Sequence, residues 1–201
     1  MTMKILLLSR TEESVGFQEE INVFGDVYYT DNLNNIPDIN YSLAISYCFG
    51  PILKPNHIDL IGCPIVNVHP SFLPYGRGIF PILWSAVLNH PFGVTIHEIS
   101  DAQIDNGGII SQHQVNINEM ATLAQAHRYL MSLSRTHLLE LLTKGFPSTF
   151  YPDKIVPDQN VASVTYRSRK DGLALLKYLP DKWQTTIKSA REIYKKKQDS
   201  Y

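Results

Sequence analysis

The sequence runs Pro64-Ile65-Val66-Asn67-Val68-His69-Pro70-Ser71-Phe72-Leu73-Pro74 where an apolar stretch gives way to polar side chains. Residues 65–68 predict a short buried strand, and the prolines that follow keep regular structure from continuing. Ligands of open α/β sheets lie outside the carboxyl ends of the strands. Because residues two apart in an extended chain point to the same side, Asn67 and His69 can address one substrate atom together. The alternative is structural: Asn67 would cap a turn and His69 would be a hydrogen-bonded core histidine.

Three later segments complete a pattern with this one. They are the loop Tyr75-Gly76-Arg77-Gly78, the strand Gly93-Val94-Thr95-Ile96-His97 and the turn Ile104-Asp105-Asn106-Gly107-Gly108-Ile109-Ile110. In this order, after Asn-x-His-Pro-Ser-x-Leu-Pro at residues 67–74, they resemble the formyltransferase family that uses 10-formyltetrahydrofolate. That family includes glycinamide ribonucleotide transformylase and methionyl-tRNA formyltransferase. The resemblance covers residues 1–150 and is densest between 42 and 115.

Strands and helices are predicted to alternate along the chain, which favours an α/β fold with a mostly parallel, Rossmann-like sheet. The predicted strands are 4–9, 26–30, 42–47, 65–68, 94–99 and 109–115, and the predicted helices are 12–24, 55–61, 79–89 and 122–144. No glycine-rich fingerprint follows the first strand, which argues against an NAD or P-loop site. We expect a catalytic domain at 1–145, in the formyltransferase fold that the resemblance implies. A short C-terminal appendage at 146–201 would pack on it, with extended pieces near 150–157 and helices at 171–179 and 181–197.

Composition is that of an ordinary globular protein, with 44% hydrophobic and 18% charged residues in a chain of 201. The formal net charge of -1 gives no overall field that would attract nucleic acid. Cys48 and Cys63 lack metal-ligand spacing, so we expect free, buried thiols and no metal site. The N-terminal apolar run is too short for a signal peptide, and no run approaches the ~20 residues that span a bilayer. A cytoplasmic protein without membrane partners is therefore expected, its oligomeric state left open.

Formyl transfer to an amine needs a donor for the developing oxyanion and a group that handles the amine's proton. The Asn67 amide can donate, and the His69 imidazole can donate or accept. Asp105, on its glycine-containing turn, can reach the same site and raise a histidine pKa above its ordinary ~6.5. The resemblance implies the same three residues as the catalytic set. His97 is left outside it, because a structural histidine explains that position equally well, and Asp101 is a weaker rival to Asp105.

The resemblance also implies where the folate donor lies. Relatives hold the pterin largely through backbone groups, here beside the loop that follows the strand at 42–47. An apolar slot would be lined from one side by this loop and from the other by the backbone of residues 100–105. For Phe49 and Leu53, a purely structural place in the core is an equal alternative. The predicted contacts are Phe49, Gly50, Ile52, Leu53, Asp101 and Ile104.

Acceptor recognition is predicted from positive and aromatic side chains, since arginines pair with phosphate oxygens and aromatic rings stack on bases. Arg77 and Gly78 follow the Asn67 segment, and Tyr166 and Arg167 lie in the C-terminal segment. In each case a solvated loop is the alternative. Glycines on either side of Arg77 permit a close approach of a ligand.

Four acceptors are compatible with the family. Arg-Gly followed by Pro and Trp departs from glycinamide ribonucleotide transformylase, while near-neutral charge and the missing RNA-binding domain disfavour methionyl-tRNA. Size and the Ser46-Tyr47-x-x-Gly50 segment resemble the small sugar N-formyltransferases and the formylation domain of peptide synthetases. A chain without adenylation or carrier modules favours the sugar over a carrier-bound aminoacyl group. We therefore predict a nucleotide-linked 4-amino-4,6-dideoxyhexose as acceptor, and a non-catalytic folate-binding protein as the alternative from another class.

Overall fold

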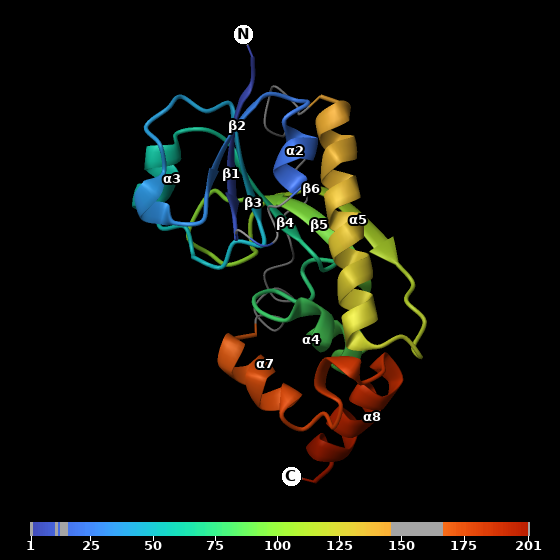
Figure 1. The fold of residues 1–201 in the computed structure, drawn as a ribbon. Helices are drawn as coiled ribbons and strands as arrows, with labels where there is room; N and C mark the ends of the chain where they lie inside the picture. The colour runs from blue at the N-terminus through green and yellow to red at the C-terminus, as the bar shows by residue number, and fades with distance from the viewer. Residues whose placement is uncertain (1, 11, 13–15, 146–166, 201) are drawn as a thin grey trace. The chain divides into compact units, whose positions relative to one another are not determined.

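The computed structural model describes residues 2–10, 12, 16–145 and 167–200, and within them one six-stranded sheet dominates (Figure 1). Its strand order is β2-β1-β3-β4-β5-β6. β1 pairs in parallel with β2 and with β3, and β3 pairs in parallel with β4. The predicted α/β fold with a mostly parallel sheet is confirmed. The strands are β1 (Lys4–Ser9), β2 (Asp26–Thr30), β3 (Leu43–Tyr47), β4 (Ile65–His69), β5 (Phe92–Glu98) and β6 (Ile109–Val115).

Two compact units divide the chain. One is formed by the described residues of 1–69, 96–111 and 134–156, and the other by those of 70–95, 112–133 and 157–201. The predicted boundary at 145 adjoins residues 146–166, which lie outside the described part of the chain together with the extended pieces expected there. The division into a domain at 1–145 and an appendage at 146–201 therefore stays a prediction.

In the first unit, helices α2 (Phe17–Ile21) and α3 (Pro55–Ile61) cover opposite faces of the parallel strands (Figure 1). Side chains alternate across a strand, so each face gathers its own apolar set. On the α3 face, Leu6 and Leu8 of β1 share a buried cluster with Ile61. On the α2 face, the ring of Phe17 packs on Tyr47 with 4.5 Å between centroids. α3 begins with a proline in its first turn and is capped at its C-terminus by Gly62, whose φ of 62° suits glycine.

In the second unit, the C-terminal helices α7 (Arg169–Leu176) and α8 (Ile187–Gln198) share one hydrophobic core with α4 (Pro81–Leu88) and the first half of α5 (Leu123–Thr143). The C-terminal segment is thus packed through apolar side chains and has no separate core among the described residues. The members of the cluster from these elements and from Leu179 are Ile82, Leu83, Trp84, Ala86, Val87, Leu123, Ala126, Leu130, Leu175, Leu176, Leu179, Ile187 and Ala190.

Several predicted elements differ in the structure. Within the helix expected at 12–24, Gly16 has a φ of 76°, and α2 covers only Phe17–Ile21. The single helix expected at 181–197 is divided into a 3₁₀ turn, η2 (Lys182–Gln184), and α8. α8 begins at Ile187 because the Thr186 side chain accepts a hydrogen bond from the Ser189 backbone N–H, which makes Thr186 its N-cap. Between β2 and β3, the chain forms the 3₁₀ turn η1 (Leu33–Asn35), which is capped by Asn32. None of the described helices combines the length and apolar character that crossing a membrane would require.

Candidate active site

β4 carries two of the predicted site residues at its carboxyl end. The strand extends one residue further than predicted and includes His69 as its last residue. Asn67 pairs in register with Ser46 of β3, so its position is set by the parallel ladder. His69 is 6% exposed, which places its imidazole inside the protein surface. Asn67 and His69 lie on the same face of the strand, as the alternation of side chains requires.

A tight turn after β5 carries Asp105. Its backbone φ of 47° lies in the left-handed region, which aspartate tolerates better than most side chains. Gly107 approaches the end of β5 so closely that a Cβ at this position would lie 1.8 Å from the Glu98 carbonyl oxygen. The Glu98 N–H donates to the Gly108 carbonyl at 2.9 Å and holds the turn there. The backbone conformation of Asp105 and the close approach at Gly107 therefore define the turn that carries the Asp105 side chain.

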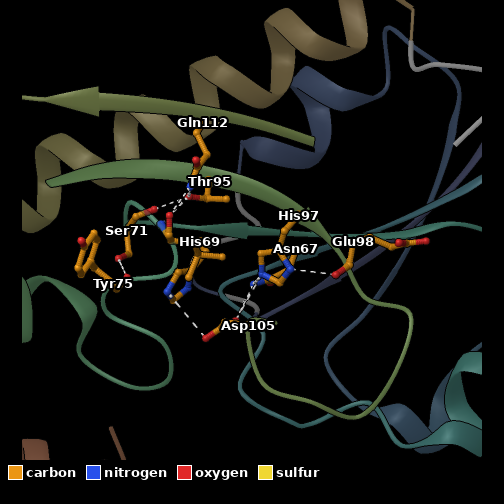
Figure 2. A network of polar contacts seen from close by, with 10 residues as sticks. Asn67, His69, Ser71, Tyr75, Thr95, His97, Glu98, Asp105 and Gln112 are labelled. Atoms are coloured by element: carbon orange, nitrogen blue, oxygen red, sulfur yellow. Dashed lines mark hydrogen bonds and ion pairs between the residues drawn. The ribbon is translucent and has the colours of Figure 1, made fainter. Parts of the chain in front are cut away.

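The three residues predicted to be catalytic come together in the first unit (Figure 2). The Asn67 amide donates to Asp105 Oδ1 at 3.3 Å. His69 Nε2 lies 3.8 Å from Asp105 Oδ2, which is ion-pair distance but longer than a hydrogen bond. The Asp105 side chain is 12% exposed, so its carboxylate faces an enclosed, polar surrounding. Their catalytic roles remain predictions.

His97 belongs to the same cluster, although it was not among the predicted site residues. Its Nε2 lies 3.0 Å from Asn67 Nδ2 and 3.5 Å from Asp105 Oδ1, and its side chain is 2% exposed. The rings of His69 and His97 stand edge to face with 6.3 Å between centroids. The signal that could have found His97 is positional, because it stands near the end of β5 as His69 does at the end of the adjacent strand β4.

The loop after β3 offers an apolar surface at the place predicted for the folate. Ile52 is 54% exposed, and nothing lies within 4 Å of where a Cβ on Gly50 would be. Phe49 is partly buried against the cluster below the loop. Leu53 is 4% exposed and fills that cluster, so its side chain has the core position that was the alternative. The role of these residues toward a folate stays a prediction.

Across the turn, Asp101 and Asp105 have different surroundings. Asp101 is exposed and accepts the Gln103 backbone N–H at 2.8 Å, which makes it part of its own turn. Asp105 contacts the histidines and Asn67 instead, so the structure brings Asp105 and not Asp101 to the cluster. Ile104, which precedes Asp105 in the sequence, is partly buried.

The loop that follows His69 lies in the second unit and is held by its own polar network (Figure 2). The Thr95 hydroxyl donates to the Ser71 carbonyl at 2.7 Å, and the Gln112 amide donates to the Leu73 carbonyl at 2.8 Å. The Ser71 hydroxyl donates to the Tyr75 carbonyl. These bonds fix the backbone from Ser71 to Tyr75 without using the residues predicted to bind a ligand.

Arg77, Gly78 and Arg167, all predicted to bind the acceptor, come together in this unit. Gly78 forms a parallel bridge with Arg167, whose N–H donates to the Arg77 carbonyl at 3.0 Å. The Arg167 guanidinium lies 5.2 Å from the centre of the Trp84 ring, a cation–π arrangement. Burial, and then the charge of Arg167, lower the pKa of His90, which keeps that imidazole neutral near the guanidinium at pH 7. Tyr166 lies outside the described residues.

Metal-binding clusters of three or more His, Cys, Asp or Glu do not occur in the described part of the chain. Cys48 and Cys63 are free thiols, both partly buried. Burial raises the pKa of the Cys63 thiol to about 11, so it is protonated and unreactive at neutral pH.

Gly107→Ala tests the backbone argument for the turn. The added methyl would meet the Glu98 carbonyl, and overpacking of this kind typically costs about 1–3 kcal/mol in free energy of unfolding. We expect urea denaturation to show that loss, together with reduced turnover because Asp105 moves. Gly50→Ala is the matched stability control, since its methyl would enter open space. Unchanged stability and turnover in Gly107→Ala would contradict the argument.

Comparison with known proteins shows which family this chain resembles. The profile of the formyl transferase family matches residues 26–142. Methionyl-tRNA formyltransferase of Borrelia garinii is 35% identical over 134 residues, which are 64% of this chain and 42% of that protein. The dTDP-4-amino-4,6-dideoxyglucose formyltransferase of Mycobacterium tuberculosis is 35% identical over 126 residues, 62% of this chain and 53% of that protein. The chain thus spans about half the length of these curated relatives or less.

A solved structure extends the similarity over nearly the whole chain. The formyltransferase PseJ from Anoxybacillus kamchatkensis, in complex with UDP-4,6-dideoxy-4-formamido-L-AltNAc and tetrahydrofolate, is 27% identical with a TM-score of 0.77. The match covers 93% of this chain and 97% of PseJ. Together with a profile match over more than half of the residues, it identifies the fold that was predicted from the Asn67 and Asp105 motifs. The chain belongs to the formyl transferase family.

Proposed function

We propose that this protein is an N-formyltransferase that moves a formyl group from 10-formyltetrahydrofolate to the amine of a nucleotide-linked 4-amino-4,6-dideoxyhexose. The observation that carries the proposal is the cluster of Asn67, His69 and Asp105 at the end of β4, in a chain of the formyl transferase family. PseJ, which is similar along its whole length, was solved with a formamido sugar nucleotide and tetrahydrofolate. These findings support a sugar acceptor over the alternatives.

The residues of the first unit fit a folate donor. Ile52 and Gly50 present an open, partly apolar surface on the loop after β3, to which a flat pterin can pack. When bound, 10-formyltetrahydrofolate supplies the formyl carbon on N10, and the acceptor amine displaces N10 with net movement of one proton from the amine to N10. Backbone groups at residues 48–53 and 100–105 can match the amide-like edge of the pterin.

The other catalytic roles are assigned to three residues of this chain. Asn67 donates an amide N–H to the formyl oxygen as negative charge develops there. His69 accepts the proton of the attacking amine and returns one to the departing nitrogen. Asp105 stabilises the imidazolium that forms between these steps. The 3.8 Å between His69 Nε2 and Asp105 Oδ2 fits a pair whose contact tightens when substrates bind.

Arg167 is proposed to pair with the diphosphate of the acceptor. Two observations support it: the bridge to Gly78 fixes its backbone, and Trp84 supports its guanidinium. We expect Arg167→Gln to raise the KM for the sugar nucleotide about 10- to 100-fold, the loss of one or two charge-assisted hydrogen bonds. Turnover at saturation and the KM for folate should change little. Initial-rate kinetics with varied acceptor measure both parameters.

Arg169→Gln is the matched control for this variant, because Arg169 is exposed in the first turn of α7. An equal rise in acceptor KM in both variants would point to general electrostatics and not to a specific contact. Point variants are sharper than deletion of the C-terminal segment. Removing α7 and α8 would also expose the apolar core that they share with α4.

The function itself is tested by incubating the purified protein with 10-formyltetrahydrofolate and dTDP- or UDP-linked 4-amino-4,6-dideoxyhexoses. Mass spectrometry of the sugar nucleotide should show one formyl group added. Glycinamide ribonucleotide, a carrier-bound aminoacyl group and methionyl-tRNA serve as competing acceptors, the last because curated relatives act on it by name. Formylation of one of these and not of the sugars would show that the acceptor belongs to that other class and would contradict the proposed sugar acceptor. Folate binding without formylation of any of them would favour the non-catalytic alternative.

A further inference from the structure

The Asn67 amide has two N–H groups, and both point at partners inside the cluster. One is directed at His97 Nε2 at 3.0 Å, and the other donates to Asp105 Oδ1 at 3.3 Å. The opposite orientation of the amide would place its oxygen against the Asp105 carboxylate, two acceptors in contact. The orientation of Asn67 is therefore set by its neighbours, and the proposed oxyanion donor has no spare N–H until one of these bonds is released.

The tautomer of His97 follows from its other ring nitrogen. Nδ1 lies 2.9 Å from the Glu98 carbonyl oxygen, which can only accept, so Nδ1 carries the hydrogen. In the neutral imidazole, Nε2 then offers its lone pair to Asn67 Nδ2. A hydrogen on Nε2 would instead face the amide donor at 3.0 Å. The carbonyl that fixes this tautomer is the one that Gly107 approaches, so the Asp105 turn and His97 share one backbone support.

We infer that His97 is a positioning residue, which holds one amide hydrogen of Asn67 throughout the reaction. The hydrogen shared with Asp105 is then the one presented to the formyl oxygen. The longer of the two bonds, to Asp105, is the one released, whereas the His97 bond is anchored by a side chain that is 2% exposed. The inference rests on the proposed N-formyltransferase function and gives His97 a role that acts through Asn67, without contact to either substrate.

Two variants of His97 separate positioning from packing. In His97→Asn the side-chain N–H can still donate to the Glu98 carbonyl, but nothing remains to accept from Asn67. In His97→Gln the side-chain oxygen reaches the place of Nε2 and can accept from Asn67. We expect His97→Asn to lower kcat at least about tenfold with the folate KM unchanged, and His97→Gln to restore most of that loss. His113→Asn, an exposed histidine on β6, is the matched control.

Equal losses of kcat in the Asn and Gln variants would assign His97 a packing role and overturn the inference, as would full activity in His97→Asn. The tautomer is measured separately by NMR in the wild-type protein labelled with nitrogen-15 and carbon-13, the His97 signals being assigned through their correlations to its backbone. A bare Nε2 and a protonated Nδ1 at neutral pH are expected, and a protonated Nε2 would overturn the inference even if the variants do not fold. If the wild-type protein formylates no acceptor, the proposed function fails, while the NMR result still decides how His97 holds Asn67.

Discussion

Replacing His69 or Asp105 by asparagine is expected to lower turnover at least about 100-fold, the usual scale of general acid–base catalysis. The reason is the geometry at the end of β4, where the imidazole and the carboxylate lie 3.8 Å apart and both side chains are largely enclosed. His69→Asn removes the group that is proposed to move the amine's proton. Asp105→Asn removes the negative charge that is proposed to stabilise the imidazolium. Single-turnover kinetics with saturating donor and acceptor measure the effect without interference from product release.

Matched controls for these variants come from exposed residues of the same type. The control variants are Asp59→Asn, at an exposed position of α3, and His113→Asn, at an exposed position of β6. Both should keep wild-type turnover, because neither side chain belongs to the cluster. If His69 and Asp105 form one functional unit, the double variant should be little slower than the slower single variant. Near-wild-type turnover in either single variant would contradict the acid–base role assigned to His69 and Asp105.

Asn67→Ala should lower turnover about 10²- to 10³-fold, as expected for the loss of an oxyanion donor. The affinity for folate should hardly change, because the amide acts on charge that is absent from the ground state. In the free protein the substitution also leaves His97 Nε2 and Asp105 Oδ1 without this donor, so a modest loss of stability is expected as well. Equilibrium binding of a folate analogue, together with turnover, distinguishes these effects.

Asn56→Ala, on the exposed side of α3, serves as the control for the removal of a carboxamide. A collapse of folate affinity with unchanged turnover at saturation would make Asn67 a binding residue. In that case the developing charge would have to be stabilised elsewhere, and His69, as a protonated imidazole, would be the next residue to consider.

The strands were the most predictable part of the fold. β1, β2 and β6 begin and end where the sequence analysis placed them, because each is an extended run bounded by turn residues. The helix predicted at 181–197 was wrong in one respect, since periodicity does not reveal that Thr186 caps a new helix. A cap depends on the backbone conformation of one residue, whereas apolar spacing reports only the average over several turns.

The members of the cluster that share one sequence motif could be predicted, whereas the member that is brought in by the pairing of two strands could not. Asn67 and His69 are two apart on β4, so their shared face follows from the sequence alone. His97 enters through the pairing of β4 with β5 and through the Glu98 carbonyl, neither of which is encoded locally. Leu53 was predicted to contact the ligand but lies in the core. An apolar residue next to a ligand-binding loop has the same sequence pattern whether it faces the ligand or the core.

The division of the chain into two compact units constrains how this protein can be engineered. The cluster of Asn67, His69, His97 and Asp105 belongs to one unit, while Arg77, Gly78 and Arg167 belong to the other. The boundaries between the units fall at 69/70, 95/96, 111/112, 133/134 and 156/157, and the middle three of these lie inside β5, β6 and α5. A chimaera that exchanges the unit with these proposed acceptor residues would therefore have to be spliced through two strands and a helix. Altered acceptor choice is therefore better sought by substituting side chains in place than by exchanging segments between homologues.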